Sequence, residues 1–296
     1  MQNSITVIIV TYNSSAVILD ALSSLPKNFP QSNVIVADNA SSDGTKALIK
    51  ENFPNIKIVE LQTNKGFGVA NNIALAEVKT DFALLLNPDA ILRDDCLEIL
   101  HKTACENPNA AIVAPLLYSG DRILESYKQS VFLREKKRSK FIVPEGPICA
   151  DFIPAAIWLV TMKNWRKIGG FDPNIFLFYE DDDLCLRARE MGYEIIFTPY
   201  ARATHKEGQS STSSAALQKF KHKNMLYSRL YLEKKYRNKM SAIKLALKIF
   251  PVIFAKNIFY FLSANFNKSA KYRGQMLALL SYFISFRFRR SAISQV

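Results

Sequence analysis

The chain has 296 residues, of which 49% are hydrophobic and 22% are charged, so it is a folded globular protein rather than a disordered one. Its charge is divided unevenly. Residues 215–296 carry 17 Lys and Arg and one acid, Glu233, whereas the first 214 residues carry 22 Lys and Arg against 25 Asp and Glu. This change predicts two parts, a domain over residues 1–214 and a basic appendage over residues 215–296.

The first 90 residues predict four strand–turn–helix units. Each strand is a short apolar run without polar alternation, which is typical of parallel strands buried on both faces. The predicted strands are 5–10, 34–37, 56–59 and 82–86, and helical patterns follow the first three, over residues 17–25, from Ser42 or Asp43 to 52, and over 69–78. This alternation predicts an α/β domain with a mostly parallel sheet flanked by helices.

The chain from residue 94 continues the same pattern. A helix is predicted over 94–106 and strands over 111–114, 157–160 and 194–197. The intervening stretch 119–148 is irregular and contains the basic run Arg134–Lys140, which we expect to be a flexible loop over the site. Thr204–Gly208 is expected to end the folded body.

Polar clusters follow four of the predicted strands, where open parallel sheets bind their ligands. These clusters are Thr11-Tyr12-Asn13, Asp38-Asn39, Asn64-Lys65-Gly66 and Asn87-Pro88-Asp89. Any one of them is ordinary turn composition, but four at one rim predict a binding site. The G-x-G-x-x-G and G-x-x-x-x-G-K-[ST] patterns are absent, which argues against a dinucleotide-binding domain and a P-loop enzyme. A nucleotidyltransferase is disfavoured because the turn after the first strand lacks glycine.

Four consecutive acids, Glu180–Asp183, follow the apolar run Phe176–Tyr179 and open a helix predicted over 181–191. They fit either a solvated first turn or a site for a polar ligand or cation, since a helix N-terminus favours anions. The apolar stripe of Leu184, Ala188 and Met191 extends back to Asp181, which predicts that Asp181 points inward. Asp183, four residues before Arg187, is expected to form an exposed ion pair.

Taken in order, these motifs resemble the inverting nucleotide-sugar glycosyltransferases of family 2, which have the GT-A fold. The resemblance covers residues 1 to about 210 and rests on Val7–Asn13, Asp38–Thr45, Asn64–Gly68, Leu86–Ala90 and Gly169–Asp172 through Glu180–Arg187. The N-P-D motif followed by F-Y-E-D-x-D-L-C-x-R is similar to the bacterial rhamnosyltransferase branch.

The resemblance also implies roles for individual residues. Asp181 matches the base that deprotonates the acceptor hydroxyl, and Asp182 is expected either to contact the acceptor sugar or to serve as the base. Asp89 and His205 match metal ligands for Mg²⁺ or Mn²⁺, although Asn87 stands where the family has the first Asp of its D-x-D motif. The residues expected to bind the donor nucleotide are Thr11, Tyr12, Asn13, Asp38, Asn39, Lys65, Asn72 and Asn87.

The implied reaction transfers L-rhamnose from dTDP-L-rhamnose to a hydroxyl of a polyprenyl-diphosphate-linked or other saccharide in O-antigen or cell-wall biosynthesis. Another family 2 donor, such as UDP-galactose or UDP-GlcNAc, is the alternative. A more distant alternative is a non-catalytic sugar- or partner-binding protein on the same fold.

The basic appendage predicts amphipathic helices. Its apolar runs, such as 249–255 and 276–284, are interrupted by Lys and Arg before the roughly 18 residues that a spanning helix needs. A helix lying in the membrane interface therefore fits better than a spanning one, and core-packing helices with solvated basic faces are the alternative. Met1 leads almost directly into a strand without a signal-peptide pattern. We expect peripheral contact with the cytoplasmic face of the bacterial inner membrane, and no nucleic-acid binding.

Overall fold

The computed structural model describes residues 4–130, 132, 141–206 and 214–293, and only the backbone of residues 285–293. The chain divides into two compact units. The first contains residues 1–174 and 180–211, and the second contains residues 175–179 and 212–296. The charge pattern gave no sign that the five residues before the acid run belong with the C-terminal part. The predicted Arg134–Lys140 loop lies outside the described residues.

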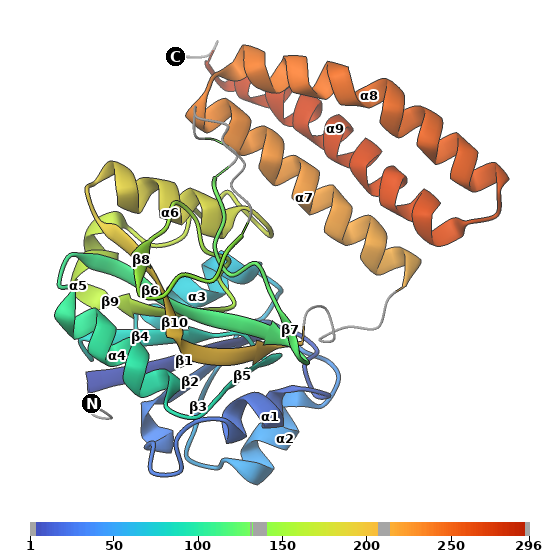
Figure 1. Cartoon of the computed structure of the whole chain (residues 1–296). Coiled ribbons are helices and arrows are strands. Elements are labelled where there is room, and N and C mark those ends of the chain that lie inside the picture. The colour runs from blue at the N-terminus through green and yellow to red at the C-terminus, as the bar shows by residue number, and fades with distance from the viewer. Residues whose placement is uncertain (1–3, 131, 133–140, 207–213, 294–296) are drawn as a thin grey trace. The chain divides into compact units, whose positions relative to one another are not determined.

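The first unit is built on one mixed sheet (Figure 1). Its order is β3-β2-β1-β4-β9-β6-β10-β5, with β7 paired to β6 and β8 to β10. β1 to β4, β6 and β10 run in one direction, while β9 is antiparallel to both β4 and β6, and β5 is antiparallel to β10. The strands are β1 (Ile5–Thr11), β2 (Val34–Asp38), β3 (Lys57–Glu60), β4 (Phe82–Leu86), β5 (Ala90–Leu92), β6 (Ala110–Ser119), β7 (Arg122–Ile123), β8 (Ile148–Cys149), β9 (Ile157–Thr161) and β10 (Glu194–His205).

Helices cover both faces of this sheet and enclose two apolar cores. Side chains alternate between the cores along each strand: Val7 and Ile9 of β1 enter one, and Ile8 and Val10 enter the other. The first core is closed by α1 (Ile18–Ser23), α2 (Thr45–Asn52) and α4 (Cys96–Glu106), and the second by α3 (Phe67–Leu75), α5 (Met162–Ile168) and α6 (Glu180–Glu190). A 3₁₀ turn (Gln31–Asn33) precedes β2. The predicted α/β sheet flanked by helices is confirmed.

Three differences from the predicted elements have simple physical reasons. β10 extends to His205, well beyond the predicted 194–197, because it finds partners in β6, β8 and β5 along its length. β5, β7 and β8 have only two or three residues, too few to produce a periodic pattern. The apolar stripe predicted on α6 ends before Met191, because the helix ends at Glu190 and leaves Met191 51% exposed.

The second unit contains three long helices, α7 (Ala215–Tyr236), α8 (Lys239–Leu262) and α9 (Phe266–Ile293). Its core is small and includes Leu226 and Leu230 of α7, Ala246 and Ile253 of α8, and Leu279 of α9. α9 approaches α7 closely at Gly274, where a Cβ atom would overlap the backbone carbonyl of Lys219. The helical appendage predicted from the sequence is therefore present.

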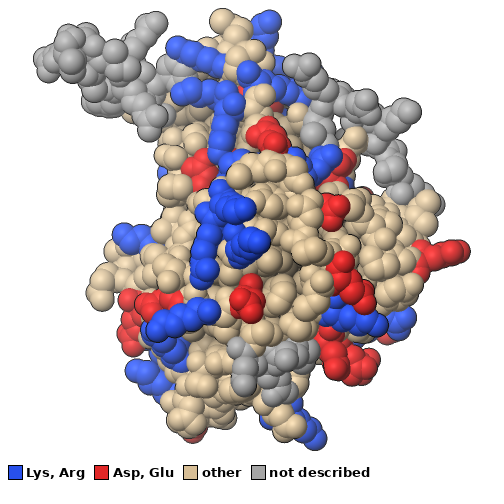
Figure 2. All heavy atoms as spheres, turned by 90° about the vertical axis from the view of Figure 1, so that its left-hand side faces the viewer, with Lys and Arg blue, Asp and Glu red and all other residues tan. Residues whose placement is uncertain are grey.

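The two units differ in surface charge. On the face in Figure 2, acidic and basic side chains are interspersed over much of the surface of the first unit, which fits the nearly balanced charges of the first 214 residues. In the second unit Glu233 is the one acid among residues 215–296, and it is buried. Apart from Glu233, the side chains whose exposure is described on α7, α8 and α9 are therefore basic or uncharged.

Candidate active site

The carboxyl ends of β1, β2, β4 and β10 meet at one edge of the sheet because these strands run in the same direction. Thr11 and Asp38 end adjacent strands and are register partners. The Thr11 hydroxyl donates to Asp38 Oδ1 at 3.1 Å, and the Ser41 N–H donates to Asp38 Oδ2 at 3.1 Å. These bonds orient the Asp38 carboxylate, which is only 1% exposed.

The turns after β1 and β2 are joined to each other. Asn13 has a φ of 54°, and its Oδ1 accepts a hydrogen bond from the Ser42 N–H at 2.8 Å. Partial burial acts to raise the pKa of Asp43, but hydrogen bonds from the Thr45 hydroxyl and the Ser15 backbone outweigh it and lower that pKa to about 2. Tyr12 leaves its ring 48% exposed. The joined turns thus present an aromatic ring to solvent beside Thr11 and Asp38.

Asn39 links the end of β2 to the loop before α3. Its Nδ2 donates to Asn64 Oδ1 at 3.0 Å, and its Oδ1 accepts from the Lys65 N–H at 2.7 Å. Asn39 is buried, whereas the Lys65 side chain is exposed. The amide of Asn39 therefore positions the loop, and the exposed Lys65 ammonium is placed to meet an anion.

Asn72, predicted to contact the donor, holds the backbone of Phe171. The Asn72 Nδ2 donates to the Phe171 carbonyl at 2.8 Å, and the Phe171 N–H donates to Asn72 Oδ1 at 2.9 Å. Gly68 permits this approach, because a Cβ there would lie 2.8 Å from Phe171 Cβ. The Asn72 amide therefore couples α3 to the segment that leads towards α6.

Asp89 and His205 are brought together by strand pairing. His205 is the register partner of Ala90, so Asp89 lies beside it, and the Lys206 N–H donates to the Asp89 carbonyl at 2.9 Å. His205 Nε2 lies 3.2 Å from Asp89 Oδ1, and Asp89 is 7% exposed. Asn87 is half-buried, and its N–H donates to the Ala156 carbonyl at 2.9 Å. Among the described residues, no group of three or more His, Cys, Asp or Glu side chains is arranged to hold a metal.

The acid run forms the first turn of α6, and most of it is buried rather than solvated. Glu180, Asp182 and Asp183 are 7%, 4% and 0% exposed, and Asp181 is half-buried. Asp181 Oδ2 accepts a hydrogen bond from the Ala155 N–H at 3.4 Å, and its Oδ1 accepts one from the Asp182 N–H at 2.9 Å. Asp181 thus faces the segment before β9, as the inward orientation predicted for it requires.

The prediction that Asp183 forms an exposed ion pair is wrong. Asp183 does pair with Arg187, at 2.8 Å between Oδ2 and Nε, but the carboxylate is fully buried. The Arg187 guanidinium also donates to the carbonyls of Ile168 at 2.9 Å and Gly170 at 2.6 Å. The pair therefore anchors the Gly169-Gly170 turn to α6, and its role is structural.

Glu180 is the residue at this site to which the sequence pattern assigned no role. Its Oε2 is buried and has no hydrogen-bond partner among the described residues. Burial and, next, the charge of Asp181 raise the pKa of Glu180 to about 8. Burial also raises the pKa of Asp181, but hydrogen bonds from two backbone N–H groups oppose that rise. Near neutral pH we therefore assign the shared proton to Glu180 and the charge to Asp181. The signal in the sequence that could have revealed this role of Glu180 is its position directly before Asp181 in the E-D pair.

The sequence of this chain matches the model of a known protein family. Residues 6–159, about half of the chain, match the model of glycosyl transferase family 2. The chain belongs to this family. It is a glycosyltransferase of the rhamnosyltransferase-like type.

Two similar relatives are rhamnosyltransferases. The N-acetylglucosaminyl-diphospho-decaprenol L-rhamnosyltransferase of Mycobacterium tuberculosis is 23% identical over 243 residues, which cover 71% of this chain and 78% of the relative. The rhamnosyltransferase WbbL of Escherichia coli is 28% identical over 221 residues, which cover 67% of this chain and 82% of the relative.

Solved structures of glycosyltransferases share the fold of this chain. The mannosyltransferase PcManGT from Pyrobaculum calidifontis, in complex with GDP-Man and Mn²⁺, matches with a TM-score of 0.56 at 16% identity and covers 95% of this chain and 87% of its own. GalNAc-T7 with UDP, GalNAc and Mn²⁺ matches with a TM-score of 0.57 at 14% identity and covers 68% of this chain and 43% of its own. The predicted GT-A fold is confirmed.

Proposed function

We propose that this glycosyltransferase transfers L-rhamnose from dTDP-L-rhamnose to a hydroxyl of a lipid-linked saccharide during surface polysaccharide synthesis. The observation that carries the proposal is the half-buried Asp181, held by two N–H groups next to the buried Glu180, whose pKa burial raises. The choice of sugar is supported by the similarity to two rhamnosyltransferases, one of which is named for a decaprenol-linked acceptor.

Asp181 is the base in this proposal. Its carboxylate takes the proton of the acceptor hydroxyl as that oxygen attacks the anomeric carbon, and the bond from this carbon to the nucleoside diphosphate breaks on the opposite face. The raised pKa of Asp181 makes its carboxylate a better proton acceptor than an exposed aspartate. Glu180, by holding its own proton, avoids placing a second negative charge beside Asp181.

The donor nucleotide is assigned to the rim formed by the ends of β1 and β2. Thr11 and Asp38 supply an oriented hydroxyl and carboxylate, and Tyr12 supplies an exposed ring. The side chains of Asn13 and Asn39 shape the surrounding turns, while Lys65 has an exposed ammonium suited to the diphosphate. In this assignment Asn72 and Asn87 act on the loops around the nucleotide, through Phe171 and Ala156.

The neighbouring Asp89 and His205 fit a divalent cation. A carboxylate oxygen and an imidazole nitrogen already converge to 3.2 Å; the oxygen suits either Mg²⁺ or Mn²⁺, and the nitrogen suits Mn²⁺ better than Mg²⁺. Two protein ligands are enough where a diphosphate supplies further oxygens. When bound, such an ion neutralises charge that develops on the diphosphate as it leaves. Asn87 contributes no carboxylate here, so Asp89 is the acid on which metal binding rests.

The second unit is assigned to the membrane because a large apolar surface on it is exposed. α8 is long and apolar enough by length and composition to cross a membrane, and it is the described helix with this property. Its side chains that are at least 43% exposed include Leu247, Phe250, Val252, Phe254, Ile258, Phe259, Phe261 and Leu262. Water-exposed apolar surface of this extent marks a binding surface.

Charged residues near the end of α8 favour a shallow position over a spanning one. Lys268 lies over the Tyr260 ring at 5.2 Å, and Lys256 and Lys271 lie over the Tyr272 ring at 5.9 and 5.7 Å. A spanning α8 would carry these ammonium groups towards the hydrocarbon, whereas a helix lying in the interface leaves them at anionic headgroups. The partner we assign is therefore the anionic surface of a bilayer, at its cytoplasmic face.

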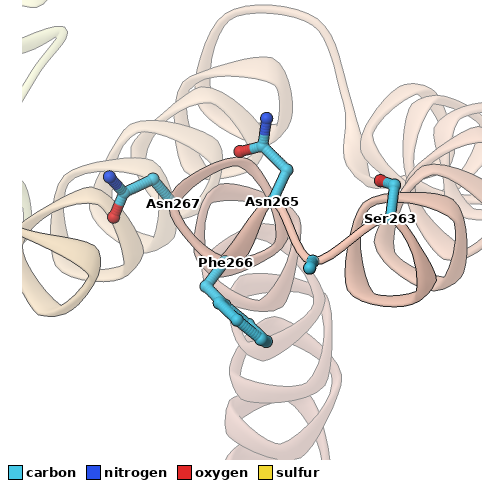
Figure 3. Close-up of a pocket in the computed structure, with 5 residues that line it drawn as sticks. Ser263, Asn265, Phe266 and Asn267 are labelled. Carbon is cyan, nitrogen blue, oxygen red and sulfur yellow. The ribbon is translucent and has the colours of Figure 1, made fainter.

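The turn between α8 and α9 extends this apolar surface. Phe266 is 56% exposed, and its ring lies 6.4 Å from that of Phe261. A shallow hollow is lined by residues 263–267, where the Phe266 ring points away from the Asn265 and Asn267 amides (Figure 3). The turn thus separates an aromatic side, suited to acyl chains, from a polar side.

Full-length protein incubated with candidate donors tests the reaction. We expect rhamnose transfer from dTDP-L-rhamnose to a polyprenyl-diphosphate-linked GlcNAc acceptor, detected by mass spectrometry, with little transfer from UDP-galactose or UDP-GlcNAc. EDTA should abolish transfer, and Mn²⁺ or Mg²⁺ should restore it to the wild type but not to Asp89→Asn. Preferential use of a UDP-sugar would overturn the assigned donor, and undiminished transfer in EDTA would overturn the assigned cation.

A further inference from the structure

The segment Ile175–Tyr179 is attached to α7, although it lies next to the acid run in the sequence. The buried Ser228 hydroxyl of α7 donates to the Leu177 carbonyl at 3.0 Å. The Phe176 ring meets the Phe220 ring of α7 edge-on, with 5.7 Å between centroids. A hydrogen bond and a ring contact therefore hold this segment against one helix of the second unit.

The last two residues of this segment have a disfavoured backbone conformation. Phe178 and Tyr179 have φ values of 66° and 68°, in the left-handed region that a side chain with a Cβ seldom adopts. Two such residues in succession persist only where surrounding contacts hold them. The next peptide bond leads into Glu180 and Asp181, so this pair sets the direction in which the chain enters α6.

Arg229 of α7 contacts Tyr179, the second residue of this strained pair. Its guanidinium lies over the Tyr179 ring, 5.9 Å from the centroid. Glu233 lies one turn further along α7 and pairs with Arg229 at 3.2 Å and with Arg237 at 2.6 Å. Glu233 is the single acid among residues 215–296, and it is only 3% exposed.

Removing a carboxylate from water is unfavourable unless it is paired, and the two arginines supply that pairing for Glu233. Membrane binding by itself does not require a buried acid on α7. Fixing the orientation of Arg229, which lies over Tyr179, does require a carboxylate at this position. The contact of Arg229 with the Tyr179 ring also holds one of the two strained residues against α7.

We propose that Arg229, oriented by Glu233, is a positioning residue for the base: it holds Tyr179 and thereby the start of α6, where Asp181 lies. This inference rests on the proposed role of Asp181. It gives the second unit a task in turnover that is separate from membrane binding. Loss of the clamp lets Phe178 and Tyr179 relax, which displaces Asp181 without removing it.

Full-length, detergent-solubilised protein with a short-chain lipid-linked acceptor tests this, because membrane binding then plays no part. We expect Arg229→Ala to lower kcat about tenfold or more, since small misplacements of a catalytic group have large effects, while the KM for the donor changes less than about twofold. Arg229→Lys keeps the cation over Tyr179 and should recover much of the loss. Lys234→Ala removes the same charge from an exposed position on α7 and should behave as wild type.

Hydrogen exchange gives a readout that does not depend on turnover. Arg229→Ala and the milder Ser228→Ala should speed exchange of the amides of residues 180–184, and Lys234→Ala should not. Unchanged exchange in both variants would overturn the inference, as would wild-type kcat for Arg229→Ala. An equal loss of kcat and of nucleotide affinity would show a general disruption and would also overturn it. Failure of the wild type to transfer any sugar would instead defeat the proposed function, while the exchange result would still judge the clamp.

Discussion

The two units contain the same local pattern, an acid followed four residues later by an arginine. The acid is buried in both, but the arginines that pair with it contact different segments. In the first unit the Asp183–Arg187 pair ties the Gly169-Gly170 turn to α6. In the second, Glu233 pairs with Arg237 and also with Arg229, which lies over Tyr179. Each buried carboxylate has an arginine partner within its own helix, Arg187 for Asp183 and Arg229 for Glu233.

The units differ in how they treat apolar surface. The first buries its apolar strands and gathers polar groups at one edge of the sheet, where burial changes the proton affinity of Glu180 and Asp181. The second has a small core and leaves one side of α8 apolar and exposed. The difference fits the proposed division, with sugar transfer in the first unit and membrane binding in the second, and Arg229 as the proposed link between them.

The largest expected effect is on turnover. Asp181→Asn should lower kcat about 10²- to 10⁴-fold, because the amide cannot take the proton of the acceptor. Nucleotide binding, measured by calorimetry, and binding to vesicles should both stay as in the wild type. Asp182→Asn is the matched control, since Asp182 is the alternative base. A larger loss of kcat in Asp182→Asn than in Asp181→Asn would assign the role of base to Asp182.

A smaller effect is expected on stability. Asp183→Asn leaves Arg187 partly buried without its counter-charge and should destabilise the first unit by about 3 kcal/mol or more. Glu233→Gln should act on the second unit instead. The two tryptophans of the chain, Trp158 and Trp165, lie in the first unit, so their fluorescence follows its unfolding in urea, while helical circular dichroism follows the whole protein. An equal shift of the tryptophan transition by Glu233→Gln would show that the two pairs are not independent.

Membrane binding should change about tenfold or more when charge is placed on α8. Phe259 and Leu262 are 64% and 77% exposed, so their replacement by Glu removes apolar contact without disturbing a core. Co-sedimentation with anionic vesicles should fall, while turnover on a detergent-dispersed acceptor should not. Ile123→Glu adds the same charge at a 45% exposed position of the first unit and is the control. If Phe259→Glu, Leu262→Glu and Ile123→Glu bound the vesicles equally well, α8 would not be part of the membrane contact.

The last effect expected is on the pH dependence of stability. The pKa of Glu180 is about 8 in the folded protein and near 4.5 when unfolded, so between these values the folded state holds more protons. The contribution of Glu180 to stability is therefore fully present below about pH 4.5 and is lost as the pH rises through 8.

Glu180→Gln, which imitates the protonated acid, should consequently lose less stability than the wild type between pH 6 and 9 in tryptophan-detected unfolding. Glu190→Gln changes an exposed acid at the other end of α6 and should follow the wild type. Parallel pH curves for Glu180→Gln and the wild type would show that Glu180 is ionised in the folded protein at neutral pH.

Much of the fold could be predicted because buried parallel strands have a simple sequence pattern. The apolar runs of β1, β2, β4 and β9 and the polar residues that follow the first three were visible without a structure. The pairing of His205 with Asp89 was less accessible, because it depends on β5, a three-residue strand antiparallel to the end of β10. Such a strand is specified by its neighbours rather than by its own residues.

By itself, the sequence determined which groups are present and which lie within one helical turn: the E-D pair, Asp183 with Arg187, and Glu233 with two arginines. Only the tertiary structure decided which of these groups lose their water. Arg187, the partner of the buried Asp183, is bonded to the carbonyl of Gly170, Glu180 lies near Gly68, and Arg229 meets Tyr179, all through residues distant in the chain. Proton affinity and ion-pair strength depend on that burial, because both are set by the solvent that long-range packing removes.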